Sequence, residues 1–224
     1  MKLKLNERAY DVLQRLGWKR KPPEFITRHN DFMELFDKIK SRALLSIERA
    51  FFLFQFSKQA LTLQGDIAEI GVYRGGGARI LAEVFSLKQI HLFDTFEGMP
   101  EVNKQEDDPK SMWKGRYNDT SLTEVKNYLS EFKNIKFYKG IFPKTSKPVT
   151  EKKFCFVHID TDIYESTKAC LEFFYPRMVS GGIIVCDDYM SLECRGVGKA
   201  VNEFLKDKKE FPIHTTYHQC AIIK

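Results

Sequence analysis

Residues 65–77 read GDIAEIGVYRGGG, and this stretch decides the fold of the chain. A short apolar run leads into a glycine-rich turn, and a helical pattern begins at once afterwards. Glycine lets the backbone turn sharply and approach a ligand closely, and the following helix N-terminus offers unpaired N–H groups to an anionic group. The stretch therefore predicts a strand, a ligand-binding turn and a helix. Its candidate ligand-binding residues are Glu69, Gly71, Tyr73, Gly75 and Gly76.

Short apolar runs and helical stretches alternate from there to the end of the chain. Further strands are predicted at 89–93, 135–138, 154–159 and 182–186, and helices at 76–86, 122–132, 166–174 and 197–208. A last apolar segment, 213–223, predicts one or two closing strands. Strands that alternate with helices form a mostly parallel sheet that is buried on both faces. We therefore expect a Rossmann-like α/β fold with helices on both faces of the sheet.

The beginning of the chain has a different pattern. Residues 1–20 and 30–60 show helix-like apolar spacing, and two prolines between them prevent one continuous helix. No linker long enough to separate two independent domains follows. We expect a helical N-terminal extension, residues 1–64, and an α/β domain, residues 65–224. The phenylalanine cluster at 51–56 would form either a buried helix face or an interface between subunits.

The second predicted strand ends at Asp94. An acid at this position of an open α/β sheet can accept hydrogen bonds from the hydroxyls of a bound ribose, and a turn or cap aspartate is the alternative. Thr95 follows directly, and Gly140 and Ile141 follow the third strand, where a backbone amide and an apolar side chain could hold an adenine ring. The spacing is not the G-x-G-x-x-G of dinucleotide binders, because Tyr73 stands where the second glycine should be.

The fourth and fifth predicted strands end in acids. Asp160 and Asp162 follow the fourth strand, and Asp187 and Asp188 follow the fifth. Carboxylates gathered at this edge of a sheet repel one another unless they share a cation or take up a proton. Oxygen ligands favour Mg2+, Mn2+ or Ca2+ over zinc, so Asp160, Asp187 and Asp188 are candidate metal ligands. The alternative is that these acids cap the following helices, as Asp162 could near Ser166.

Taken in order, these segments resemble the macrocin and mycinamicin O-methyltransferases, bacterial enzymes that methylate sugar hydroxyls of macrolide antibiotics. The matching stretches are 65–76, 93–100 (FDTFEGMP), 140–145 (GIFPKT), 158–167 (HIDTDIYEST), 181–189 (GGIIVCDDY) and 196–201 (GVGKAV). The resemblance implies a class I methyltransferase fold with S-adenosylmethionine as the methyl donor. It also implies helical N-terminal segments that help to close the site and form contacts in a homo-oligomer.

The resemblance assigns roles to individual residues. It places the metal ligands on the three acids named above, ribose binding on Asp94, and Glu97 near the substrate. Methyl transfer needs an acceptor oxygen that is aligned with the sulfonium and has lost its proton, and a divalent metal such as Mg2+ would lower the pKa of that hydroxyl. Asp160, Glu97 and Asp162 are the candidate proton acceptors. His158 is a further candidate, although a histidine inside an apolar strand is more often a satisfied core residue.

The expected acceptor is a small molecule or glycan, with a sugar hydroxyl of a glycosylated natural product or polysaccharide as the target. The polar segment 102–119 predicts a mobile lid, and its sequence leaves the acceptor open. One alternative is an NAD-dependent oxidoreductase on the same fold, which the glycine spacing and the adjacent Asp187 and Asp188 disfavour. Another is a non-catalytic protein that binds S-adenosylmethionine, which the acids at both strand ends oppose.

Composition limits the remaining classes. The formal net charge is +6, and Lys and Arg are scattered among nearly as many acids, so we expect no nucleic-acid partner. No apolar run approaches the ~20 residues that cross a bilayer, and the N-terminus lacks the apolar core of a signal peptide, so we expect no membrane association. Five cysteines without CxxC pairing indicate a reduced, cytoplasmic protein.

Overall fold

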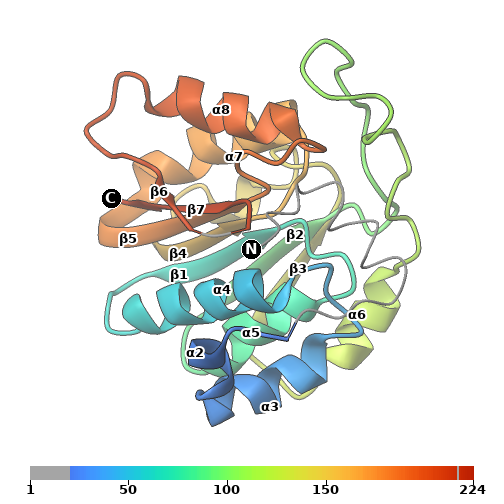
Figure 1. The fold of residues 1–224 in the computed structure, drawn as a ribbon. Coiled ribbons are helices and arrows are strands. Elements are labelled where there is room, and N and C mark those ends of the chain that lie inside the picture. Colours follow the sequence, from blue (N-terminus) through green and yellow to red (C-terminus); the bar gives the residue numbers. More distant parts are fainter. Residues whose placement is uncertain (1–20, 216) are drawn as a thin grey trace, which may run out of the picture.

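The computed structural model describes residues 21–215 and 217–224, so the helix predicted for residues 1–20 lies outside the described residues. Seven strands form one sheet in the order β3-β2-β1-β4-β5-β7-β6 (Figure 1). Strands β1 to β5 run parallel to one another, and β7 pairs antiparallel with β5 and β6. The predicted Rossmann-like, mostly parallel sheet is confirmed.

The strands lie where the apolar runs predict them. Their bounds are β1 Asp66–Ile70, β2 Ile90–Asp94, β3 Ile135–Lys139, β4 Phe154–Ile159, β5 Met178–Asp187, β6 Ile213–His214 and β7 Gln219–Ile223. Every residue of β4 is buried, as expected for a central strand of a sheet that is covered on both faces. Strand β5 begins earlier than predicted, because Met178 already pairs with Phe154 of β4.

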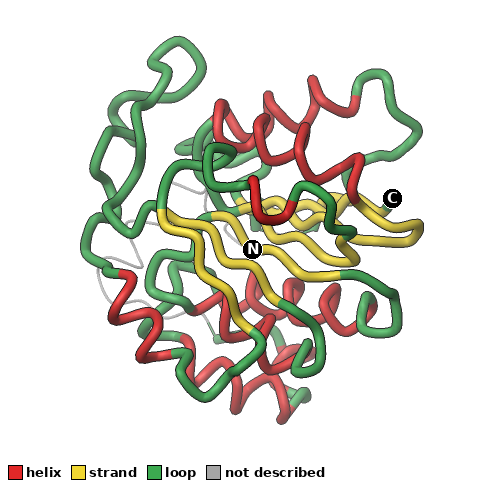
Figure 2. The backbone as a smooth tube through the Cα atoms, turned by 180° about the vertical axis from the view of Figure 1, so that it is seen from behind, coloured by secondary structure: helices red, strands yellow, loops and turns green. Residues whose placement is uncertain are grey.

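Helices cover both faces of the sheet (Figures 1 and 2). One face carries α2 Glu24–Thr27, α3 Asn30–Ile39, α4 Ile47–Gln59, α5 Gly76–Val84 and α6 Leu122–Tyr128. The other face carries α7 Tyr164–Phe174 and α8 Arg195–Leu205, and two short 3-10 turns occupy Lys147–Val149 and Tyr175–Arg177. None of the helices among the described residues is long and apolar enough to cross a membrane.

The N-terminal helices share a hydrophobic core with the sheet. Phe32 of α3 and Phe51 and Phe54 of α4 belong to the same buried cluster as Ile67 of β1 and Ile80 of α5. A buried helix face therefore accounts for the phenylalanine cluster. The helical pattern predicted over residues 30–60 forms two helices rather than one, since the chain turns between α3 and α4.

The long polar segment 102–119 forms neither helix nor strand and is attached to α7 and α8. The carboxylate of Asp107 is fully buried, and the backbone N–H of Tyr164 donates to both of its oxygens at 3.1 and 3.3 Å. This contact caps α7, whose own N-cap residue, Ile163, provides no side-chain hydrogen bond. The expectation that Asp162 caps this helix is therefore wrong, because the carboxylate that reaches the helix comes from the distant Asp107.

Candidate active site

A cavity of about 360 Å³ opens at the carboxyl edge of the sheet. It lies where β1 has β2 on one side and β4 on the other, which is the point where open α/β sheets bind their ligands. The turns after β1, β2 and β3 line one part of the wall, called here the glycine-turn side. The loops after β4 and β5 line another part, called here the acid side. Residues 42–45 and 116–117 complete the wall.

The glycine turn packs tightly against the rest of the chain. Gly71 has φ +88°, and a Cβ there would lie 1.8 Å from the backbone oxygen of Asp160. A Cβ on Gly76 would lie 2.5 Å from the Cβ of Ala43, in the loop before α4. Both Gly71 and Gly76 line the cavity, whereas Gly75 is the N-cap of α5 in the left-handed region, with φ +87°, and lies outside its wall. The glycines therefore let neighbouring segments of the protein approach one another.

Asp94, at the end of β2, holds the glycine turn in place. Its Oδ2 accepts hydrogen bonds from the backbone N–H groups of Val72 and Tyr73 at 2.7 and 2.8 Å. Its Oδ1 accepts one from the backbone N–H of Phe96 at 2.6 Å. The turn role, which the sequence left as an alternative, is thus present in the structure. Asp94 also lines the cavity, so the ribose contact stays a prediction.

The other residues predicted for this side divide into two groups. Those that line the cavity are Glu69, Tyr73, Thr95, Gly140 and Ile141. The side chain of Glu97 is exposed, forms an ion pair with Lys139 at 2.6 Å, and is not part of the cavity wall. The structure therefore does not bring Glu97 to the predicted site.

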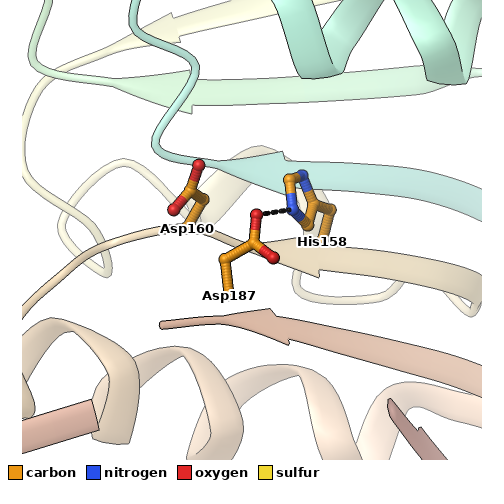
Figure 3. A group of neighbouring side chains, drawn as sticks. All are labelled: His158, Asp160 and Asp187. Carbon is orange, nitrogen blue, oxygen red and sulfur yellow. Dashed lines mark hydrogen bonds and ion pairs between the residues drawn. The ribbon is translucent and has the colours of Figure 1, made fainter. Parts of the chain in front are cut away.

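Four carboxylates gather at the acid side: Asp160, Asp162 and Asp188 line the cavity, whereas Asp187, the last residue of β5, is buried and is not part of the wall. Their possible ligand atoms form two groups, within each of which these atoms lie within 4.8 Å of one another: His158, Asp160 and Asp187; and Asp162, Asp188 and Cys194. Figure 3 shows the first group, in which the carboxylates of Asp160 and Asp187 lie close together. The three predicted metal ligands are thus divided between neighbouring groups, with Asp188 in the second.

Two arginines line the cavity near these acids, Arg116 close to Asp162 and Arg49 of α4, which forms an ion pair with Asp188. Its Nη1 lies 3.1 Å from Oδ1 of Asp188, and its Nη2 donates to the backbone oxygen of Leu44. Sequence reasoning missed Arg49, although an arginine inside the phenylalanine-rich run 47–56 was a usable signal. Its charge also acts on Asp187 and Asp162, so one guanidinium is shared among several carboxylates.

Burial and mutual repulsion disturb the ionisation of these acids. Burial, then the charges of Asp187 and Asp162, raise the pKa of Asp160 well above its ordinary value. Burial and Asp188 raise the pKa of Asp162 in the same direction. Burial would also raise the pKa of Asp187, but Arg49 and a hydrogen bond from His158 lower it below its ordinary value. In the absence of a bound cation, these acids therefore disfavour being ionised together.

His158 is held on both sides and faces no open space. Its Nδ1 lies 2.9 Å from Oε1 of Glu69, and its Nε2 lies 3.1 Å from Oδ2 of Asp187. Burial favours the neutral ring, yet the hydrogen bonds to Asp187 and Glu69 raise the pKa of His158 well above its ordinary value. Because both nitrogens are engaged, the structure supports the core interpretation of His158 rather than a role as base.

The acid side fits a hard divalent cation. The Asp160 carboxylate lines the cavity and accepts no hydrogen bond from any residue that the structure describes. Asp160 is half-buried, and a carboxylate that is partly removed from water and has no donors is costly unless a cation or proton compensates it. All-oxygen donor sets of this kind suit Mg2+, Mn2+ or Ca2+. Asp160 and Asp187 would hold such an ion, together with Asp188 from the neighbouring group.

The sheet order, the glycine turn before α5, the acid ending β2 and the cavity beside β4 together define a class I methyltransferase fold. Solved structures support this class. The chain has a TM-score of 0.71 to the O-methyltransferase NovP, with 24% identity over 82% of each chain. It has a TM-score of 0.69 to the calicheamicin methyltransferase CalS11, with 18% identity over 93% of this chain and 95% of that one.

The chain belongs to the macrocin O-methyltransferase family, since residues 57–221 match the family described as Macrocin-O-methyltransferase (TylF). A similar relative is the mycinamicin III 3''-O-methyltransferase of Micromonospora griseorubida, 30% identical over 62% of this chain and 60% of the relative. Another is the 8-demethyl-8-(2,3-dimethoxy-alpha-L-rhamnosyl)-tetracenomycin-C 4'-O-methyltransferase of Streptomyces olivaceus, 28% identical over 58% and 55%. The chain thus matches little more than half the length of these relatives.

Proposed function

We propose that this protein transfers a methyl group from S-adenosylmethionine to a hydroxyl of a sugar, on a glycosylated natural product or a polysaccharide. The observation that carries the proposal is the single cavity that joins the glycine-turn side to the acid side. Membership of the macrocin O-methyltransferase family supports the reaction. The relative whose name specifies a rhamnosyl-tetracenomycin supports the class of acceptor.

The glycine-turn side is the proposed donor site. Asp94 and Thr95 would face the ribose, and Gly140 and Ile141 the adenine. Gly71 keeps the β1 and β4 ends in contact, so the donor would lie directly beside the acids. The donor supplies an electrophilic methyl group on its sulfonium, and the protein has to align an acceptor oxygen with it.

The acid side is the proposed place where the acceptor hydroxyl loses its proton. A divalent cation such as Mg2+, held by Asp160, Asp187 and Asp188, would lower the pKa of that hydroxyl. We favour Asp162 as the proton acceptor, because it lines the cavity beside Asp188 and is not one of the three proposed ligands of the cation. Asp160 could accept the proton as well, whereas Glu97 lies outside the cavity wall.

The remaining predictions about partners and location stay proposals. We propose that the acceptor is a glycan or a small molecule, that the protein binds neither nucleic acid nor membranes, and that it forms a homo-oligomer. Phe51 and Phe54 lie in the core and Phe56 packs partly buried against it, whereas Phe52 belongs to no core cluster, so the phenylalanines do not identify a subunit interface. The five cysteines are buried and free, which is consistent with a reduced, cytoplasmic protein.

Mass spectrometry of reaction products tests the proposed function. Purified protein, S-adenosylmethionine and Mg2+ are incubated with a panel of glycosylated acceptors, and one acceptor should gain the mass of one methylene group. Asp162→Asn should lower turnover by about 100-fold, the usual contribution of a general base. The matched control Glu97→Gln should change turnover by less than about threefold, because that side chain is exposed and paired with Lys139.

Three results would contradict parts of this proposal. Tight NAD binding with no S-adenosylmethionine binding would overturn the reaction. Full turnover in the presence of a chelator would overturn the role of the cation. A turnover of the Asp162→Asn variant that is no lower than that of Glu97→Gln would remove Asp162 as the proton acceptor.

A further inference from the structure

Four buried polar side chains lie across adjacent strands of the sheet, and we call them the buried polar row. They are Glu69 of β1, His158 of β4, Asp187 of β5 and Gln219 of β7. Glu69 pairs in register with His158, and Asp187 pairs with Gln219. No side chain of the row is more than 1% exposed.

Hydrogen bonds connect the row from end to end. Oε1 of Glu69 lies 2.9 Å from Nδ1 of His158, and Nε2 of His158 lies 3.1 Å from Oδ2 of Asp187 (Figure 3 shows the second contact). The side-chain amide of Gln219 donates to Oδ1 of Asp187 at 2.6 Å. One imidazole ring therefore fixes the carboxyl groups of two strands that are not neighbours.

Packing alone does not explain why these positions are polar. Strand β4 is otherwise apolar and buried along its whole length, and apolar side chains would fill the same space without a cost of desolvation. A network of this kind stabilises the fold only when all of its members are satisfied. Oε2 of Glu69 and Oε1 of Gln219 are buried and have no hydrogen-bond partner among the residues that the structure describes.

The row extends from the cavity wall at Glu69 to the group of acids that contains Asp160. Glu69 lines the cavity, and its unpartnered Oε2 is an acceptor that a cationic group of a ligand could use. Asp187 lies in the group that contains Asp160, where a divalent cation fits. His158 lies between these two carboxylates and is not part of the cavity wall.

We propose that His158 is a positioning residue that orients Glu69 toward the methyl donor and Asp187 toward the cation. This inference rests on the proposed function, because it assumes that the α-ammonium group of the donor lies on one side and a divalent cation on the other. Hydrogen-bond partners that orient a metal ligand affect metal affinity even though they do not touch the metal. A change at His158 should therefore alter the affinity for both ligands. A change at Glu69 should alter only the affinity for the donor, and a change at Gln219 only the affinity for the cation.

Calorimetric binding measurements test the inference without an acceptor or turnover. S-adenosylhomocysteine and MnCl2 are titrated separately into the wild-type protein and three variants, well below the melting temperature of each. His158→Leu should weaken both ligands by about tenfold or more, the usual effect of losing an orienting partner. Glu69→Gln should weaken S-adenosylhomocysteine alone, and Gln219→Leu should weaken Mn2+ alone.

His158→Gln keeps the test decisive where the leucine variant does not fold. The glutamine amide can donate to one of the two carboxylates but presents its oxygen to the other, so the affinity for at least one ligand should fall about tenfold. A purely structural histidine would lower the melting temperature and leave both dissociation constants unchanged.

The outcomes separate this inference from the proposed function. The positioning role alone is overturned if the wild type binds both ligands and a folded His158→Gln variant binds each with a dissociation constant within about twofold of the wild-type value. A wild-type protein that binds neither S-adenosylhomocysteine nor Mn2+ overturns the proposed function and the positioning role together.

Discussion

The two sides of the cavity are built from different kinds of contact. On the glycine-turn side, the carboxylate of Asp94 accepts three backbone N–H groups, and the turn packs against the backbone of other segments. On the acid side, carboxylates face the cavity with few donors, and Arg49 forms an ion pair with Asp188. The first side is fixed before any ligand arrives. The second keeps unbalanced charge that a cation can use.

This difference indicates how the protein divides the work of binding. Preorganised backbone contacts offer a defined shape to a large, rigid ligand at little further entropic cost. Unbalanced buried carboxylates cost stability in the free protein, and a bound cation recovers that free energy. The following variants act on one side, on the other, or on the contact between them.

The largest effect is expected for Gly71→Ala, at the contact between the two sides. The new Cβ would lie 1.8 Å from the backbone oxygen of Asp160, and φ is +88°. Strain and overpacking together should lower the free energy of unfolding by about 3 kcal/mol or more. Urea unfolding measures this loss.

Gly115→Ala is the matched control for that variant. Gly115 has φ +84°, but a Cβ there meets nothing within 4 Å, so only the backbone strain of about 1 kcal/mol remains. If both variants lose the same free energy of unfolding, the close approach of β1 and β4 is not the cause of the loss in Gly71→Ala.

A loss of about 3 kcal/mol is also expected for Arg49→Met, which acts on the acid side. The variant leaves Asp188 and its neighbours without their cation, in a place where both partners are mostly buried. Mn2+ should then raise the melting temperature of the variant more than that of the wild type, because the ion becomes the main compensating charge. Thermal denaturation with and without Mn2+ measures both effects.

The control for Arg49 lies on the same helix. Lys58 of α4 pairs with Asp31 at the surface, so Lys58→Met should cost less than about 0.5 kcal/mol and leave the response to Mn2+ unchanged. A Mn2+ response that is no larger in Arg49→Met than in the wild type would argue against a cation site on the acid side.

Asp94→Asn acts on the glycine-turn side and should have a smaller effect. Both oxygens of Asp94 accept hydrogen bonds, but the NH2 group of asparagine can only donate. At least one backbone N–H therefore loses its partner, at a cost of about 1–2 kcal/mol in the free energy of unfolding. S-adenosylhomocysteine should bind about tenfold more weakly, which calorimetry measures. Asp119→Asn, an exposed partner of Tyr73, is the control and should leave the affinity unchanged.

The smallest effect is expected for Asp107→Ala, which lies beyond both sides. Loss of the cap on α7 should cost about 1 kcal/mol. The segment 102–119 should then be cleaved faster in limited proteolysis, because its buried attachment is gone. Unchanged cleavage would show that Asp107 does not hold this segment.

The sequence predicts the parts of this molecule that local patterns determine. Apolar runs predict β1 to β5, and the acids that follow β2, β4 and β5 gather at the cavity because parallel strands end at one edge of the sheet. The interpretation of His158 as a satisfied core residue also agrees with its contacts.

Contacts between distant segments were outside the reach of those patterns. Arg49 meets Asp188, Asp107 caps α7, and Ala43 packs on Gly76, and in each case the partners are far apart in the chain. Glu97 is close to Asp94 in sequence, yet its side chain pairs with Lys139 and is not part of the cavity wall, so its role stays a prediction. Sequence spacing gives the strand end but not the direction of each side chain beyond it.

A crystal structure of the protein with S-adenosylhomocysteine and Mn2+ tests the central claim most directly. We expect adenosine beside Gly140 and Ile141, and an anomalous peak for Mn2+ in contact with Asp160 and Asp187. A cavity without the nucleoside at saturating concentration, or Mn2+ bound only elsewhere on the protein, would contradict the account.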